Sequence, residues 1–330
     1  MRAVESDFCG ADKLVKIAVV IPCYNGERWV AAAIDSVLAQ NCQALEIIVV
    51  DDGSTDRTAS VLKGFGSRIA VLTQQNCGVS AARNAGARFA SGTHLKFLDA
   101  DDLMPAGALE ALTRVAEAHR GMVIVGRAAA VDQYGVPTQG ESGYDIGCRL
   151  QTGELIDPSY LITQATSSSL WLLPKIVFLE SGGFDTTTRL GEELCFTKEL
   201  IRAGAEFVFL DREISLIRNH DGERLSRAGG ESDYLRVLQE IEGCLNAVAS
   251  QYPVAPDARL RIARMCWMLG RHCLRSGFQT AAGAFFSYAR SVAGAEAING
   301  SAIYRLLQRL MGPDHAEHLL QGAKRTMSRH

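Results

Sequence analysis

Residues 16–52 read K-I-A-V-V-I-P-C-Y-N-G-E-R-W-V-A-A-A-I-D-S-V-L-A-Q-N-C-Q-A-L-E-I-I-V-V-D-D, and this stretch decides the fold. It opens with the β-branched run 16–21, which predicts a buried strand that ends at Pro22. Residues 27–40 then carry apolar side chains at helical spacing, and 45–50 is a second apolar run that leads into two aspartates. A strand, a helix and a strand of these lengths predict a βαβ unit.

The same alternation continues along the first hundred residues. It predicts a helix over 58–63, a strand over 69–72, a helix over 79–90 and a strand over 95–98. We therefore expect an α/β fold with a Rossmann-like, mostly parallel central sheet flanked by helices, and ligands at the carboxyl ends of its strands. A Rossmann dehydrogenase would need G-x-G-x-x-G after its first strand, but this chain has P-C-Y-N-G-E there.

Acidic residues follow the last of these strands. In F-L-D-A-D-D, residues 97–102, Asp99 and Asp101 are two positions apart and leave the same face of an extended segment. Two carboxylates on one face repel each other unless a cation lies between them, and hard oxygen ligands suit Mg²⁺ or Mn²⁺ holding a diphosphate. A metal-diphosphate site is the hypothesis, and an acidic turn after a buried strand is the alternative.

Composition limits the class of protein. The 330 residues, 47% hydrophobic and 22% charged, describe an ordinary globular chain of one large or two modest domains. The formal net charge of -3, without a basic block, argues against a nucleic-acid partner. The nine cysteines are scattered without a C-x-x-C pair or zinc spacing, which predicts reduced thiols and a cytoplasmic location. We expect no transmembrane segment, because no apolar run reaches about 18 residues.

Four segments in order resemble the motifs of the family 2 glycosyltransferases: P-C-Y-N-G-E (22–27), V-V-D-D-G-S-T-D (49–56), N-C-G-V-S-A-A-R-N-A-G (76–86) and F-L-D-A-D-D (97–102). Weaker matches follow at E-S-G-G-F-D (180–185), G-E-E-L (191–194) and I-R-N-H-D-G-E-R-L-S-R (217–227). The resemblance implies a GT-A fold. It also implies inverting transfer of a sugar from a nucleotide-diphosphate donor, with a UDP-sugar expected, to a hydroxyl of a glycan or lipid-linked glycan in polysaccharide biosynthesis.

The resemblance also assigns roles to residues of this chain. It places the donor against Pro22, Tyr24, Asn25, Glu27, Asp52, Arg83, Asp99 and Ala100, with Asp52 accepting a hydrogen bond from the base. It makes Asp101, Asp99 and His220 the ligands of a divalent metal, Mn²⁺ or Mg²⁺. Asp102 is expected instead to cap the helix over 105–119.

The catalytic base departs from the family pattern. The family uses the second residue of a Glu-Asp pair, whereas this chain has Glu192 and Glu193. The extra methylene shifts the carboxylate by about 1 Å or more, and such a misplacement can cost about a hundredfold in rate. Glu193 is the expected base and Glu192 the alternative. The alternative functions are a catalytically impaired nucleotide-sugar-binding protein and a nucleotidyltransferase, although the basic, glycine-rich loop usual in the latter is absent from this sequence.

Beyond residue 228 the sequence predicts helices alone, over 233–250, 258–275, 279–293 and 303–311. Gly270 and other small residues recur at the spacing of two closely crossing helices. The expected division is an N-terminal extension (1–15), a catalytic domain (16–228, with a nucleotide-binding half at about 16–122 and an acceptor half at about 123–228) and a helical region (229–330). The helical region is a candidate homo-oligomer surface, and its basic end leaves open a peripheral contact with the inner face of the membrane.

Overall fold

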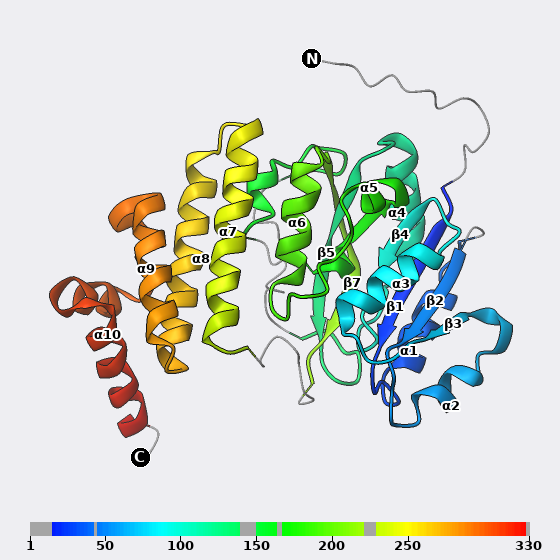
Figure 1. Ribbon diagram of the computed structural model, residues 1–330, viewed down its shortest axis with the longest axis horizontal. Coiled ribbons are helices and arrows are strands. Elements are labelled where there is room, and N and C mark those ends of the chain that lie inside the picture. Colours follow the sequence, from blue (N-terminus) through cyan, green and yellow to red (C-terminus); the bar gives the residue numbers. More distant parts are fainter. Residues whose placement is uncertain (1–14, 43–44, 139–149, 164–166, 221–228, 328–330) are drawn as a thin grey trace.

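The computed structural model describes residues 15–42, 45–138, 150–163, 167–220 and 229–327. Its centre is a seven-stranded sheet of order β3-β2-β1-β4-β6-β5-β7 (Figure 1). The strands are β1 (Ile17–Cys23), β2 (Leu45–Asp51), β3 (Ala70–Thr73), β4 (His94–Phe97), β5 (Val123–Val131), β6 (Trp171–Pro174) and β7 (Phe207–Arg218). Strand β6 runs antiparallel to β4 and β5, while the other neighbours are parallel. The predicted mostly parallel α/β sheet is therefore confirmed.

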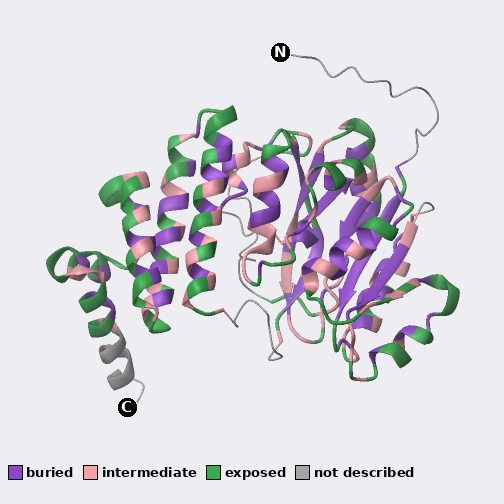
Figure 2. Cartoon of the chain, viewed as in Figure 1, coloured by how far each residue is buried: buried purple, intermediate pink, exposed green. Residues whose placement is uncertain are grey.

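Helices cover both faces of the sheet because its strands are apolar on both sides. The first face carries α1 (Val30–Leu38), α2 (Thr58–Lys63) and α4 (Ala108–Ala118), and the second carries α3 (Val79–Phe89), α5 (Lys175–Glu180) and α6 (Glu192–Arg202). Ile17 and Val19 of β1 join the core of the first face, whereas Val20 joins the core of the second. Figure 2 shows this continuous burial along the central strands. Helix α3 lies so close to β1 that a Cβ on Gly86 would meet Val20 at 2.4 Å.

Two predicted features of residues 16–122 need correction. Helix α1 begins at Val30 rather than at residue 27, because the chain first makes a turn in which the N–H groups of Trp29 and Val30 donate to the carbonyl of Gly26. The expected capping by Asp102 is wrong. Helix α4 starts after Gly107, and the buried Asp102 carboxylate instead accepts the backbone N–H of Arg218 at 2.9 Å.

The C-terminal helices are α7 (Glu231–Gln251), α8 (Pro256–Arg275), α9 (Gln279–Ala293) and α10 (Ala302–Met327). They share one apolar core with the second face of the sheet, and Lys198 of α6 pairs with Glu240 of α7 at 2.5 Å. The predicted close helix crossing is confirmed, because a Cβ on Gly270 would meet the ring of Phe286 at 2.8 Å. Helix α10 is longer than predicted and continues past a kink at Gly312. Short 3₁₀ helices complete the described fold: η1 (Gly66–Arg68), η2 (Pro158–Tyr160), η3 (Ser168–Leu170) and η5 (Gly294–Ala297).

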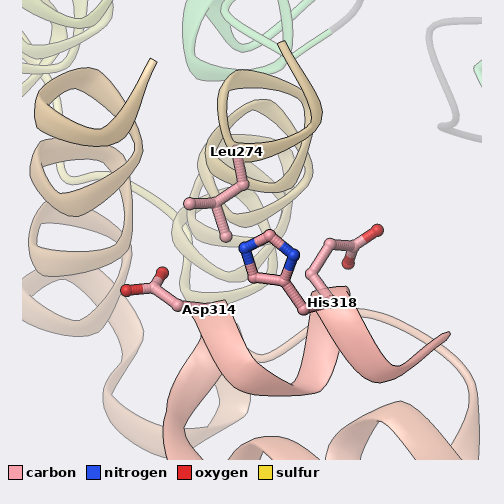
Figure 3. Close-up of a pocket in the computed structure, with 4 residues that line it drawn as sticks. Leu274, Asp314 and His318 are labelled. Atoms are coloured by element: carbon pink, nitrogen blue, oxygen red, sulfur yellow. The ribbon is translucent and has the colours of Figure 1, made fainter. Parts of the chain in front are cut away.

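Helix α10 is tied to α8 by a buried carboxylate. Glu317 accepts hydrogen bonds from Arg271 at 2.7 Å and from Arg275 at 3.2 Å. A small, polar surface depression beside this contact is lined by Leu274, Asp314, Glu317 and His318 (Figure 3). It lies at the end of the helical region that is far from the sheet (Figure 1). Among the helices described, none has the length and apolar character needed to cross a membrane. The expected extension before residue 15 and the expected boundary at 228 fall outside the described residues.

Candidate functional site

One buried guanidinium joins three carboxylates that are far apart in the sequence. Arg83 lies in the first half of α3, and its side chain is 3% exposed. Its Nη2 donates to Oδ1 of Asp99 at 2.9 Å and lies 3.5 Å from Oε1 of Glu193. Its Nη1 donates to Oε1 of Glu192 at 3.5 Å. Asp99 follows β4, and both glutamates open α6, so Arg83 brings the acidic loop and the expected base together.

This cluster carries a net negative charge, because three carboxylates face one guanidinium. Burial alone would lower the pKa of Arg83, but Asp99, Glu193 and Glu192 raise it above its usual value, so Arg83 stays charged. Burial, reinforced by Glu192 and opposed by Arg83, raises the pKa of the Glu193 carboxyl to about 8. Glu193 can therefore take up a proton near neutral pH, which is the property required of a general base.

Asp101 and His220 form a second polar pair next to this cluster. Nε2 of His220 and Oδ2 of Asp101 are 3.0 Å apart. The side chains of Asp99 and Asp101 are 32% and 37% exposed. Within the described residues, no group of three or more His, Cys, Asp or Glu side chains is arranged to hold a metal ion. Mg²⁺ at phosphate sites usually binds one or two carboxylates together with phosphate oxygens and water, so these exposed carboxylates have suitable chemistry for a cation that arrives with a diphosphate.

Arg218, at the end of β7, fixes the backbone of the acidic loop. Its Nε donates to the carbonyl of Asp101 at 2.7 Å, and its own N–H donates to the Asp102 carboxylate. Its guanidinium lies over the ring of Trp29, 4.7 Å from the centroid, and that ring is 5.4 Å from the ring of His220. Arg218 is a residue of the site that the sequence motifs did not predict. Its place in the I-R-N-H segment, two residues before His220, is the signal that could have found it.

A second cation, Lys96 of β4, lies fully buried beneath the same loop. Its Nζ donates to the carbonyl of Phe97 at 2.8 Å and also to the carbonyl of Ser169 in η3. Burial lowers the pKa of Lys96 to about 7, although Asp99 and Asp102 act in the opposite direction. Lys96 thus joins the strand before the acidic loop to the segment before β6. The sequence feature that could have identified Lys96 as a site residue is its place inside the otherwise apolar run 95–98.

The loops after β1 and β2 are hydrogen-bonded to each other. Asn25 donates its N–H to Oγ of Ser54 at 2.9 Å, and its side-chain oxygen accepts the N–H of Thr55 at 2.8 Å. The Glu27 carboxylate accepts the N–H of Arg57 at 2.9 Å. Asn25 and Glu27 therefore shape the rim of the site, and any contact of theirs with a donor stays a prediction.

The other residues expected at the donor lie on the same rim. Pro22 is a buried residue of β1 that pairs with Val50, whereas Tyr24 is 51% exposed beyond the strand end. Gly26 lies close to Ala100, because a Cβ on this glycine would be 3.8 Å from the Ala100 side chain. The ring of Tyr24 is thus accessible to a ligand at the edge of the sheet, where β1 ends.

Asp52 organises the loop that leads into α3. Its Oδ1 accepts from the Gln74 side chain at 2.7 Å and from the N–H of Cys77 at 2.9 Å, and its Oδ2 accepts the N–H of Gly78 at 2.8 Å. The residue is 3% exposed. Because a carboxylate has about four acceptor positions, one remains for a further donor, and the expected hydrogen bond from a base stays a prediction.

Residues 18–165 match the model of a family described as Glycosyl transferase family 2. This part of the chain is similar to the family 2 glycosyltransferases. The chain is 37% identical over 114 residues to the glycosyltransferase GlyA of Streptococcus pneumoniae, a match that covers 34% of this chain and 16% of GlyA. It is 27% identical over 232 residues to a glycosyltransferase of Rickettsia typhi, covering 68% of this chain and 69% of the relative. The glycosyltransferase match therefore spans a small part of GlyA but most of the Rickettsia protein.

A solved structure extends the likeness beyond the family domain. The crystal structure of S. aureus TarS 1-349 in complex with UDP-GlcNAc superposes with a TM-score of 0.66 at 18% identity. The match covers 94% of this chain and 92% of the TarS chain. The expected GT-A fold with a C-terminal helical region is therefore confirmed.

Replacing Arg83 with Gln should destabilise the protein, and the loss should be largest at alkaline pH. Removing one member of a buried ion pair costs about 3 kcal/mol or more. The remaining carboxylates repel one another when they are ionised, and Glu193, with a pKa of about 8, ionises late. The destabilisation should therefore grow as the pH rises from about 4 to about 9. Thermal unfolding of wild type and variant across this range measures it.

The control for this prediction is Arg202→Gln, because Arg202 is a 55% exposed arginine on α6 that pairs with the half-buried Glu199. A surface pair contributes little to stability, so this variant should unfold at nearly the wild-type temperature. If Arg83→Gln unfolds below the wild-type temperature by the same amount at every pH, Arg83 is not the counter-charge of the three carboxylates.

Proposed function

We propose that this protein is an inverting glycosyltransferase that moves a sugar from a UDP-sugar to a hydroxyl of a glycan acceptor. The observation that carries the proposal is the contact of Glu193, at the start of α6, with the same Arg83 guanidinium that binds Asp99 of the acidic loop. The match to the family 2 model supports glycosyl transfer. The fold shared with TarS, which was crystallised with UDP-GlcNAc, supports a UDP-sugar as donor.

In this mechanism Glu193 removes the proton of the acceptor hydroxyl as that oxygen attacks the anomeric carbon from the face opposite the diphosphate. Arg83 holds the Glu193 carboxylate near Asp99, and the charge of Glu192 strengthens the affinity of Glu193 for the proton. Glu192 contacts the same guanidinium at 3.5 Å, so it is the alternative base. Both glutamates begin α6, where the helix dipole favours negative charge.

We further infer that Asp101, Asp99 and His220 bind a divalent cation, Mn²⁺ or Mg²⁺, together with the donor. When bound, such a cation stabilises the negative charge that develops on the leaving diphosphate. Two contacts of Asp101 support this inference: Arg218 donates Nε to its carbonyl at 2.7 Å, and Nε2 of His220 lies 3.0 Å from its carboxylate. Arg83 holds one oxygen of Asp99 in the same way.

Asp101→Asn should remove the metal dependence of UDP binding. The amide keeps the shape of the side chain but loses the charge that the cation requires. Titration calorimetry with UDP, with and without Mn²⁺, should show tighter binding with Mn²⁺ in the wild type and no such gain in the variant. Asp211→Asn is the matched control, since Asp211 is 48% exposed and pairs with Arg127 on β5. A wild-type gain with Mn²⁺ in Asp101→Asn would contradict the proposed metal site.

Glu193→Gln should lower sugar transfer by about a hundredfold to ten-thousandfold and leave UDP affinity nearly unchanged, because Gln cannot act as a base. The base works only when deprotonated, so kcat/KM of the wild type should rise with pH up to about 8, and Glu193→Gln should lose this rise. Rates with UDP-GlcNAc and Mn²⁺ over a pH series measure both effects.

Two further variants separate the alternatives. Glu193→Asp should slow transfer if the backbone fits the longer side chain, and should speed it if Glu193 is an impaired substitute for Asp. Loss of transfer in Glu192→Gln with normal transfer in Glu193→Gln would move the base to Glu192. A wild type that binds UDP-sugars but transfers none of them would establish the binding-protein alternative, which the Glu-Glu pair motivates.

A further inference from the structure

The turn after β5 holds the large apolar side chain with the highest exposure in the described part of the chain. Tyr134 is 79% exposed, and the neighbouring Val136 is 57% exposed. The turn itself is well ordered by hydrogen bonds. Oδ1 of Asp132 accepts the N–H of Tyr134 at 2.8 Å and that of Val136 at 2.9 Å, and the Asp132 carbonyl accepts the N–H of Gly135 at 3.0 Å. The backbone that carries the exposed ring is therefore fixed.

Two arginines connect this turn to the candidate site through Gln133. The carbonyl of Gln133 accepts Nη1 of Arg218 at 2.8 Å, and its side-chain oxygen accepts Nη2 of Arg28 at 3.1 Å. The same Arg218 donates Nε to the carbonyl of Asp101 at 2.7 Å. A single guanidinium therefore separates the backbone of the turn from the backbone of the acidic loop.

Both arginines make cation–π contacts with the ring of Trp29. The guanidinium of Arg28 lies 4.2 Å from the centroid of this ring, and that of Arg218 lies 4.7 Å from it. Cation–π contacts of this kind stabilise the two donors that hold Gln133. Isolated exposed apolar residues are common on protein surfaces and need no function. A turn fastened to the acidic loop by such a set of contacts is different, because Arg218 holds the backbone next to the exposed ring against the backbone of the acidic loop.

We propose that the Tyr134 ring is an acceptor subsite, on which one sugar ring of a glycan acceptor stacks. This inference rests on the proposed glycosyl transfer and adds to it the chemistry of the acceptor. A pyranose ring has an apolar C–H face that matches an aromatic surface, while its hydroxyls stay in water. An aromatic side chain provides a large contact area at low conformational cost, and a fixed turn lowers that cost further. Tyr134 also follows β5, in the half of the domain expected to bind the acceptor.

The test compares acceptor kinetics of the wild type, Tyr134→Ala, Tyr134→Phe and Tyr252→Ala at saturating UDP-GlcNAc and Mn²⁺. The acceptor probes are cellotetraose, chitotetraose and maltotetraose, and the one that the wild type glycosylates fastest is used throughout. Tyr252 is the matched control, because it is 43% exposed at the end of α7 in the helical region. The dissociation constant of UDP is measured for each variant.

Tyr134→Ala should raise the acceptor KM about tenfold and leave the UDP dissociation constant within about twofold of the wild type. Tyr134→Phe keeps the ring face and should retain most of the acceptor affinity, and Tyr252→Ala should match the wild type. An unchanged acceptor KM in Tyr134→Ala overturns the subsite, as does an equal loss of UDP affinity. Glycosylation of a polyol phosphate but of none of the oligosaccharides also overturns it, while the proposed transferase stands. A wild type that transfers sugar to no acceptor contradicts the proposed function itself.

Discussion

The charge of Arg83 is the constraint on which the rest of the site depends. Asp99 lies in the loop after β4, and Glu193 lies in the first turn of α6. Their carboxylates would repel each other without a cation between them. The guanidinium reaches both because α3 packs tightly on the sheet, where Gly86 leaves no room for a side chain against Val20. Close helix packing therefore sets the distance between the acidic loop and the proposed base.

The acidic loop is surrounded by basic side chains before any ligand binds. Arg83 approaches it from α3, Lys96 lies beneath it in β4, and Arg218 reaches it from β7. Each makes hydrogen bonds to carboxylate or carbonyl oxygens, which offsets the cost of burying its charge. The backbone of Asp101 is therefore held in place while its carboxylate stays exposed. Groups fixed in advance need little reorganisation when charge moves during a reaction, and this is a major source of enzymatic rate.

Local sequence patterns predicted the elements before residue 122 well, because strand and helix signals alternate regularly along this part of the chain. Motif order assigned roles to Asp99 and Glu193 separately, whereas their shared contact with Arg83 needed the structure. The four-residue antiparallel strand β6 (Trp171–Pro174) lies outside this alternation, and local patterns did not predict it. Asp102 was misassigned because a nearby helix made capping the obvious local role, whereas its partner, Arg218, lies 116 residues away. Such long-range partners leave no trace in local spacing.

The proposed single displacement, with Glu193 opposite the leaving diphosphate, fixes the stereochemistry of the product. Proton NMR of the glycoside formed from UDP-GlcNAc, in which the sugar is α-linked, reads the new anomeric configuration directly. A β-linked product, with its large coupling between H1 and H2, is the result expected when one base activates the acceptor for one in-line attack. An α-linked product would require two displacements or a front-face reaction, and would contradict the role assigned to Glu193.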